Sequence, residues 1–252
     1  MLHSLWYRFV LIITLPIAAR YVTGDTTGFF YIADQNNAIT KIDSAGNKWF
    51  RYSDITNGNI YSIDASNPFR SIVFYKQQQV IQILDNNLGL VSTIQLRKNN
   101  LMNISATARS SDNNIWLYDA VDMNIKKIND YGKLVAVSAD IFQLVGHTPQ
   151  ITFMTEENHK IFVCDTTSGI IVFDEYLNYE KTIPIKPKTQ IQVVNQSLFY
   201  IEHNQITEYN LTTKAEQTDT LQDIRTFQSA LLFRKFMITQ EQNAVSLYRL
   251  TP

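Results

Sequence analysis

The side chains best suited to chemistry are widely separated in this sequence. The four histidines stand at positions 3, 147, 159 and 203, so they lack the short spacings typical of metal-binding histidines. Cys164 is the single cysteine, which excludes an intramolecular disulfide and a cysteine-based zinc site. It follows the apolar run at residues 161–163, and this position predicts a buried thiol that serves as a small hydrophobic group.

Glu156 and Glu157 form an acidic pair. Paired carboxylates perform acid–base chemistry only where their surroundings separate the two pKa values, and we expect this pair to be solvated in a hairpin loop. The sequence contains no Gly-x-Ser-x-Gly motif, no phosphate-binding loop and no glycine-rich dinucleotide turn. These observations favour a protein without catalytic activity over an enzyme, and they predict neither a cofactor nor a catalytic metal.

Three oxygen-bearing side chains are candidates for ligand binding. Asp64 ends an apolar run, Asn103 precedes another, and Asn195 follows a third. One carboxylate with two amides could bind calcium weakly, or could hydrogen-bond a polar ligand. Turn capping is the competing interpretation, because Asn and Asp are the turn residues throughout a chain with only 8 Gly and 6 Pro.

Composition places the chain among globular proteins. Its 252 residues are 45% hydrophobic and 18% charged, which is enough to bury a core in a single large domain. The formal net charge is -1, so no strongly basic surface is expected and nucleic acid is not a predicted partner.

Internal repetition is the strongest signal in the sequence. An apolar strand, a short polar turn and a second strand recur six times, and each copy before the last closes on Asp or Asn. The copies close at Asp43, Asp85, Asn129, Asp174, Asn210 and Arg249, in steps of 42, 44, 45, 36 and 39 residues. A period of about 40 residues built from short strands is typical of β-propeller blades. The runner-up architecture, a β-sandwich pair or another open β array, predicts no fixed period.

Each copy has room for two more strands. Runs at 60–64, 103–107, 151–154 and 191–194 precede the core pairs, and runs at 91–96, 133–137 and 181–185 follow them. We expect the first set to line a central channel and the second set to form outer edges. The sequence therefore predicts an all-β protein, a single propeller of about six four-stranded blades. Residues 21–23 would supply the innermost strand of the first blade.

With this pattern, residues 20–250 resemble the six-bladed propeller class that includes NHL-type and quinoprotein-like repeats. The stretch from Ser62 to Tyr75, followed by Leu84 and Asp85, is also similar to uncharacterised exported propellers of Gram-negative bacteria. That resemblance implies a fold and an envelope location, and it brings no known chemistry. Six-bladed lactonases carry a calcium site built from separate blades, which implies a metal-dependent, lactonase-like or other hydrolase as the alternative function.

The N-terminus has the features of a signal peptide. Arg8 precedes an apolar run at residues 9–17, and small residues offer cleavage after Ala19 or Gly24. The expected organisation is a signal peptide at 1–19 and a propeller at 20–252. We expect an exported protein of the periplasm, cell surface or medium, with no transmembrane anchor after cleavage.

The leading functional prediction is a non-catalytic binding or scaffold module of the cell envelope. It would engage a protein or a glycan through loops at one rim of the channel. Asp64, Asn103 and Asn195 are the candidate binding residues. The protein would be a monomer or a subunit of a larger assembly.

Overall fold

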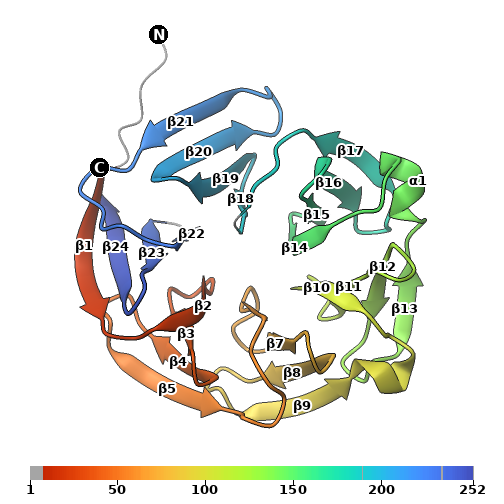
Figure 1. The fold of residues 1–252 in the computed structure, drawn as a ribbon, viewed down its shortest axis with the longest axis horizontal. Helices are drawn as coiled ribbons and strands as arrows, with labels where there is room; N and C mark the ends of the chain where they lie inside the picture. Colours follow the sequence, from red (N-terminus) through yellow and green to blue (C-terminus); the bar gives the residue numbers. More distant parts are fainter. Residues whose placement is uncertain (1–7, 189, 234, 252) are drawn as a thin grey trace.

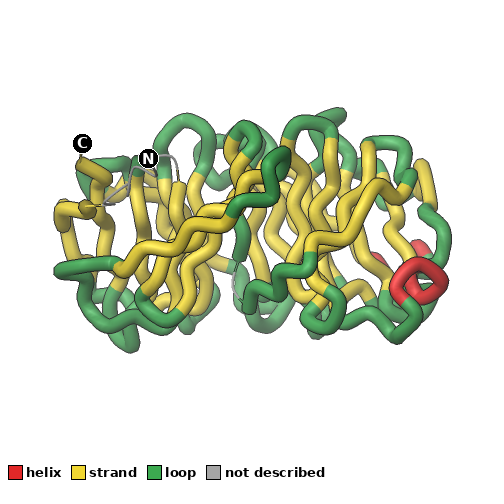
Figure 2. The backbone as a smooth tube through the Cα atoms, turned by 90° about the horizontal axis from the view of Figure 1, so that it is seen from above, coloured by secondary structure: helices red, strands yellow, loops and turns green. Residues whose placement is uncertain are grey.

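The computed structural model describes residues 8–188, 190–233 and 235–251, and it is a ring of six β-sheets around a central channel (Figure 1). Each sheet has four antiparallel strands, so the predicted six-bladed propeller is confirmed. Seen from the side, the blades form one layer whose strands run between two rims of loops (Figure 2).

The first three blades follow the chain from the channel outwards. Blade one contains β2 (Ala19–Gly24), β3 (Phe30–Asp34), β4 (Ala38–Ile42) and β5 (Lys48–Ser53). Blade two contains β6 (Ser62–Asp64), β7 (Ser71–Tyr75), β8 (Val80–Leu84) and β9 (Leu90–Gln95). Blade three contains β10 (Ile104–Arg109), β11 (Ile115–Asp119), β12 (Asn124–Ile128) and β13 (Leu134–Val137).

The remaining blades repeat this order until the last strand. Blade four contains β14 (Ile151–Glu157), β15 (Lys160–Asp165), β16 (Gly169–Asp174) and β17 (Tyr179–Ile183). Blade five contains β18 (Gln192–Val194), β19 (Ser197–Glu202), β20 (Gln205–Asn210) and β21 (Glu216–Thr220). Blade six contains β22 (Ser229–Phe233), β23 (Phe236–Gln240), β24 (Val245–Thr251) and, outermost, β1 (Arg8–Leu15).

The ring closes through the N-terminal segment. Strand β2 is the innermost strand of blade one, as the sequence predicted for residues 21–23. Strand β1 lies within the predicted signal peptide and completes blade six beside β24. The described propeller therefore begins at Arg8 instead of residue 20, because the apolar run pairs with the last strand. Residues 1–7 of the predicted signal peptide lie outside the described residues, and cleavage stays a prediction.

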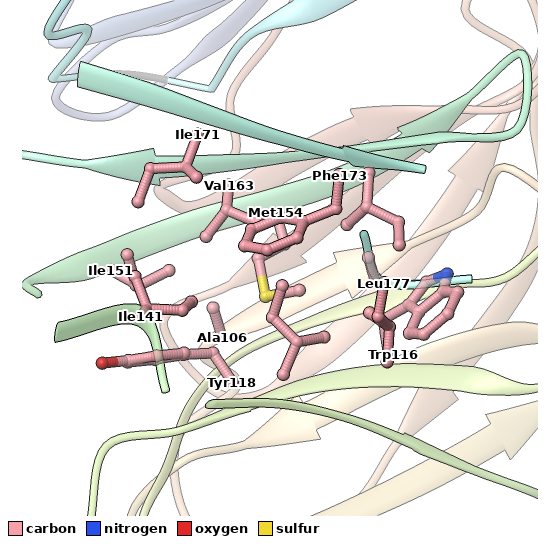
Figure 3. Close-up of a cluster of buried hydrophobic side chains, with 13 residues drawn as sticks. Ala106, Trp116, Tyr118, Ile141, Ile151, Met154, Val163, Ile171, Phe173 and Leu177 are labelled. Atoms are coloured by element: carbon pink, nitrogen blue, oxygen red, sulfur yellow. The ribbon is translucent and has the colours of Figure 1, made fainter. Parts of the chain in front are cut away.

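Apolar clusters between neighbouring blades form the core. Between blades three and four, Trp116 and Tyr118 pack against Met154, Val163 and Phe173 (Figure 3). The middle strands of a blade bury side chains on both faces, since each face meets another blade; every residue of β7, β8 and β11 is buried. This two-sided burial explains the near-continuous apolar runs in the repeat.

The residues that close the repeats have one shared role. In five of them a side-chain oxygen accepts hydrogen bonds from two backbone N–H groups within the next four residues, with N···O distances of 2.7–3.0 Å. These residues are Asp43, Asp85, Asn129, Asp174 and Asn210. These caps hold the turn between the third and fourth strands, which confirms five predicted equivalent positions. Arg249 differs, because it lies inside β24 and pairs with Val10 of β1.

Two short helices join blades. The 3-10 helix η1 (Leu96–Asn99) links blades two and three, and α1 (Ile141–Val145) links blades three and four. Within the part of the chain that the structure describes, no helix has the length and apolar character needed to cross a membrane.

Candidate functional site

The inner strands of the blades surround a cavity of about 310 Å³. Hydroxyl and amide side chains line it together with four aromatic rings, those of Tyr21, Tyr61, Phe153 and Phe233. Three carboxylates also lie in this wall, those of Asp64, Glu156 and Glu157, whereas the described lining residues include no Lys, Arg or His. The channel is therefore a mainly apolar cavity that also carries hydroxyl and amide groups and negative charge, which favours cationic or neutral ligand groups.

The two ends of the channel carry different residues. The four strands of a blade alternate in direction, so the chain leaves each blade at the rim where it entered. All the inner strands therefore run in the same direction. We call the rim where they end the top rim and the rim where they begin the bottom rim. Residues that follow an inner strand share the top rim, and residues that precede one share the bottom rim.

The three predicted binding residues do not share a rim. Asp64 ends β6 and Asn195 follows β18, so both lie at the top rim, and both line the cavity. Asn103 precedes β10 at the bottom rim, where its carbonyl accepts a hydrogen bond from the Ala120 N–H at 2.9 Å. The structure thus brings Asp64 and Asn195 to one channel mouth and leaves Asn103 at the other.

Asp64 holds two blades together at the channel mouth. Its Oδ1 accepts a hydrogen bond from the Ser66 N–H at 2.9 Å, which caps the loop after β6. Its Oδ2 accepts the Arg109 N–H at 2.7 Å, which joins blade two to blade three. Each oxygen of this carboxylate therefore has a structural partner.

Asn195 occupies the turn between β18 and β19 with a φ of 55°, a left-handed conformation that Asn tolerates. Its carbonyl accepts a hydrogen bond from Asn158 Nδ2 at 3.3 Å, across the junction of blades four and five. The Asn195 side chain is exposed, and it makes no hydrogen bond to another described residue. Its amide is therefore free to meet a ligand at the mouth of the channel.

The sequence had suggested that Glu156 and Glu157 lie in a solvated hairpin loop, but they end strand β14. Glu157 is exposed, as predicted, whereas Glu156 is half-buried. Glu156 Oε2 accepts hydrogen bonds from Ser110 Oγ at 2.9 Å and from Trp116 Nε1 at 2.5 Å. Its Oε1 accepts the Ser111 N–H at 3.2 Å. Ser110, Ser111 and Trp116 belong to blade three, so these hydrogen bonds tie Glu156 of blade four to its neighbour.

Glu157 has the opposite orientation on the strand, because successive side chains alternate. Reduced hydration at the channel mouth, and then repulsion from Glu156, raise the pKa of the Glu157 carboxyl. Its backbone pairs with Lys160, but its carboxylate makes no hydrogen bond or ion pair with any other described residue. The Glu157 carboxylate therefore lies at the channel mouth without a structural partner among the described residues.

Exposed aromatic side chains form an arc on the top rim across four consecutive blades. They are Trp49 at 57% exposure, Phe69 at 66%, Tyr131 at 88% and Tyr176 at 79%. We call these four residues the aromatic arc. None of the four was among the binding residues predicted from the sequence. A signal was present for Tyr131 and Tyr176, since each stands two residues after the Asn or Asp that caps its turn.

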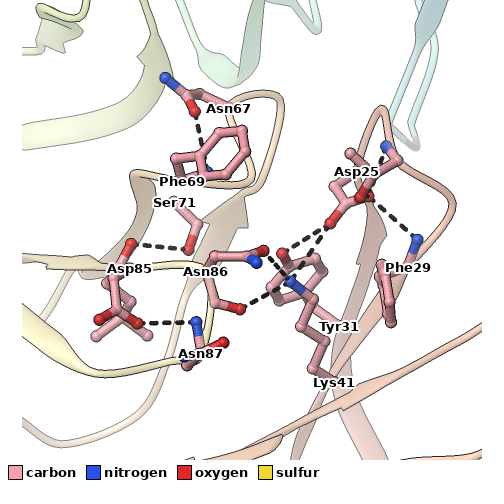
Figure 4. Close-up of polar contacts among 12 residues, drawn as sticks. Asp25, Phe29, Tyr31, Lys41, Asn67, Phe69, Ser71, Asp85, Asn86 and Asn87 are labelled. Atoms are coloured by element: carbon pink, nitrogen blue, oxygen red, sulfur yellow. Dashed lines mark hydrogen bonds and ion pairs between the residues drawn. The ribbon is translucent and has the colours of Figure 1, made fainter. Parts of the chain in front are cut away.

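A buried ion pair shapes the top rim between blades one and two (Figure 4). Lys41 Nζ lies 3.7 Å from Asp25 Oδ2, and it donates to the Asn86 backbone carbonyl at 2.9 Å and to Asn86 Oδ1 at 2.7 Å. The Tyr31 hydroxyl donates to the same Asp25 oxygen at 2.9 Å. Burial lowers the pKa of Lys41, and the Asp25 carboxylate opposes that change. This network joins two blades.

The remaining titratable candidates are dispersed. Cys164 is buried as predicted, and burial raises the pKa of its thiol. His147 Nε2 lies 2.8 Å from Asp165 Oδ2 at the bottom rim, and His159 Nδ1 lies 3.0 Å from Glu175 Oε2 at the top rim. Position 3 falls outside the described residues. Over the residues that are described, no three His, Cys, Asp or Glu side chains converge closely enough to hold a metal ion.

The fold resembles those of several solved structures. A streptogramin B lyase superposes with a TM-score of 0.66 at 12% identity, covering 97% of this chain and 98% of that protein. The WD40 domain of Pan2 from Neurospora crassa gives 0.61 at 9% identity, over 100% and 98%. BamB from Moraxella catarrhalis gives 0.51 at 11% identity, over 91% and 82%.

No protein-family profile and no curated protein matches this sequence. At identities of 9–12% the structural likeness shows the propeller fold alone.

Proposed function

We propose that this protein is a non-catalytic binding or scaffold module that holds a protein or glycan against its top rim. The observation that carries the proposal is the aromatic arc. Large aromatic rings exposed on turn tips give up no contacts within the fold when a partner covers them, and such rings dominate binding energy at interfaces. Aromatic faces also stack on sugars and cations.

Polar groups at the channel mouth also favour the top rim as the binding face. Asn195 offers a free amide and Glu157 a carboxylate without a structural partner, and both line the channel cavity at the same rim as the arc. Pockets that bind ligands combine apolar walls with a few placed polar groups, and this mouth has both. In the proposed site Asp64 positions the loops, while Asn195 and Glu157 contact the ligand. Asn103 takes no part, because it lies at the bottom rim.

The alternative function, a metal-dependent hydrolase in the channel, receives less support. It would use Asp64 as the carboxylate ligand, yet the two oxygens of Asp64 already accept backbone N–H groups at 2.9 and 2.7 Å. A streptogramin B lyase and BamB share this fold, so the fold itself favours neither function. Envelope location was predicted from the N-terminal apolar run as a cleaved signal; the structure places part of that run in β1, and the location stays a prediction.

The decisive experiment compares the two rims. Tyr131→Ser and Tyr176→Ser combined remove two members of the aromatic arc, whereas Val121→Ser and Phe142→Ser combined remove exposed apolar groups at the bottom rim. We expect glycan-array and cross-linking signals to fall about tenfold or more for the top-rim variant and to persist in the control. Equal binding by both variants would contradict the proposal.

A parallel assay separates binding from catalysis. Purified protein is analysed for bound metal and incubated with lactone and ester substrates. Stoichiometric metal, with turnover that Asp64→Ala abolishes, would replace the binding function by the hydrolase alternative.

A further inference from the structure

We infer that residues 8–15 remain in the folded protein as the strand that closes the propeller, so that the apolar N-terminal run acts as a clasp on blade six. Strand β1 pairs with β24 along its whole length, from Arg8 opposite Thr251 to Leu15 opposite Val245, with one bulge near residue 12. The pairing joins segments from the two ends of the described chain (Figure 1). Residues 8–15 thus complete a sheet that would otherwise have three strands.

The side chains of β1 enter two cores. Phe9 is 4% exposed and packs in the cluster between blades five and six, with Met237 and Tyr248. Leu15 is buried in the cluster between blades six and one, beside Val245. Removal of the strand would open the apolar layers on both sides of blade six.

Blade one is shaped to receive the strand. Gly46 lies against Ile13, and a Cβ added at this glycine would sit 2.7 Å from Ile13 Cγ2. Thr14 Oγ1 shares a hydrogen bond with Ser246 Oγ at 2.9 Å, inside the blade-six pairing. The positive φ of 87° at Gly46 belongs to its turn, and the absence of a Cβ leaves the space that Ile13 occupies.

The bond that signal cleavage would cut is also part of the fold. Ala19 is buried, and its carbonyl accepts hydrogen bonds from Gln35 Nε2 at 3.1 Å and Gln240 Nε2 at 2.7 Å. These contacts join the start of β2 to blades one and six. In the folded state this peptide bond is closed to a protease, which needs an accessible, extended segment.

Loss of β1 would change the surface as well as the core. Strand β24 would present an unpaired row of backbone N–H and C=O groups from Val245 to Thr251. Such an open edge recruits other strands and promotes aggregation. The clasp therefore protects the end of the ring, and this role does not depend on what the top rim binds.

A pair of neighbouring substitutions distinguishes a closing strand from a removed leader. Phe9→Ser and Val10→Ser each place one polar residue in the same apolar run, but Phe9 is 4% exposed and Val10 is 49% exposed. If β1 is a clasp, the stability of the protein depends on the side chains on its buried face. We expect Phe9→Ser to lower the melting temperature by about 5 °C or more and Val10→Ser to change it by less than about 2 °C. As a leader, both variants would impair export alike and leave the mature protein equally stable, which would overturn the inference.

Two further measurements test the clasp even if the Phe9→Ser variant fails to fold. The intact mass of the protein isolated from its own cells should include residues 8–15; a stable product beginning at Arg20 would refute the clasp. A chain truncated to begin at Arg20 should also regain stability when a synthetic peptide of residues 6–17 is added, whereas a scrambled peptide should have no effect. Truncated protein as stable as the full chain, without any peptide, would equally refute it.

Discussion

The ammonium of Lys41 lies 3.7 Å from the carboxylate of Asp25, and neither side chain exposes more than 1% of its surface. Lys41 stands in the third strand of blade one, and Asp25 follows the innermost strand of the same blade. Asn86 of blade two completes the solvation of the ammonium with two oxygens. Lys41 therefore links a buried charge pair within blade one to Asn86 of blade two.

Breaking this pair on one side should be costly, because the remaining charge stays buried without its partner. We expect Lys41→Met to lower the free energy of unfolding by about 3–5 kcal/mol. Lys41→Met combined with Asp25→Asn should recover much of that loss. The control is Lys160→Met at the exposed Lys160–Glu180 pair, where the change should stay below about 1 kcal/mol. Urea unfolding of the variants tests the difference, and similar losses at both pairs would contradict it.

Adjacent glutamates at the channel mouth should differ in their contribution to stability. Glu156→Ala leaves Trp116 Nε1, Ser110 Oγ and the Ser111 N–H without their acceptor, and it should cost about 1–3 kcal/mol. Glu157→Ala removes no hydrogen bond to a described residue and should change stability by less than about 0.5 kcal/mol. Thermal and urea denaturation measure both variants. The reverse order would show that the assignment of roles is wrong.

Gly169 should not tolerate a side chain. Its φ is 114°, and an added Cβ would lie 2.2 Å from the Ile183 carbonyl oxygen of the paired strand. Gly146 also has a positive φ, of 76°, but a Cβ there would meet no atom within 4 Å. Gly146→Ala should cost about 1–2 kcal/mol from backbone strain alone, and Gly169→Ala should cost clearly more. Comparable melting temperatures for the two variants would contradict this steric explanation.

Asp165 should contribute to acid sensitivity. Burial alone would raise its pKa, but hydrogen bonds from Ser168, the Gln150 N–H and His147 outweigh this effect and lower the pKa from 3.8 to about 2. The folded state therefore favours the charged carboxylate. Its stabilisation is complete above pH 4 and is lost as the pH falls through about 2. Asp165→Asn should be less stable at neutral pH and should lose less further stability between pH 4 and 2.

Urea titrations at a series of pH values test the Asp165 prediction. Parallel stability curves for the wild type and Asp165→Asn below pH 4 would show that this carboxylate does not couple folding to protonation.

Much of the fold could be predicted from the sequence because each blade is a local unit. The caps at Asp43, Asp85, Asn129 and Asp174 accept backbone N–H groups from within the next four positions, so they leave a periodic trace in the sequence. Strands that bury both faces likewise appear as unbroken apolar runs. The inner and outer strands followed from the order of segments within each repeat.

The candidate site was less predictable because it depends on which rim a residue reaches. Asp64 and Asn103 both border inner strands, yet one follows its strand and the other precedes it, so they lie at opposite ends of the channel. Because all inner strands run in the same direction, the order of residue and strand alone would have predicted that Asp64 and Asn103 lie at opposite rims. The sequence had suggested that Glu156 was solvated. Its role as an acceptor could not be predicted, because the donor Trp116 lies 40 positions earlier in another blade.

The sequence by itself determined the blade repeat, the buried strands, the capped turns and the inert position of Cys164. Each of these depends on neighbours within a few residues or on the alternation of one strand. Only the tertiary structure decided the contact of Lys41 with Asn86, the partners of Glu156, the top-rim arc, and the pairing of residues 8–15 with β24. Those relationships join residues of different blades, or of opposite ends of the chain, and they exist only once the ring has closed.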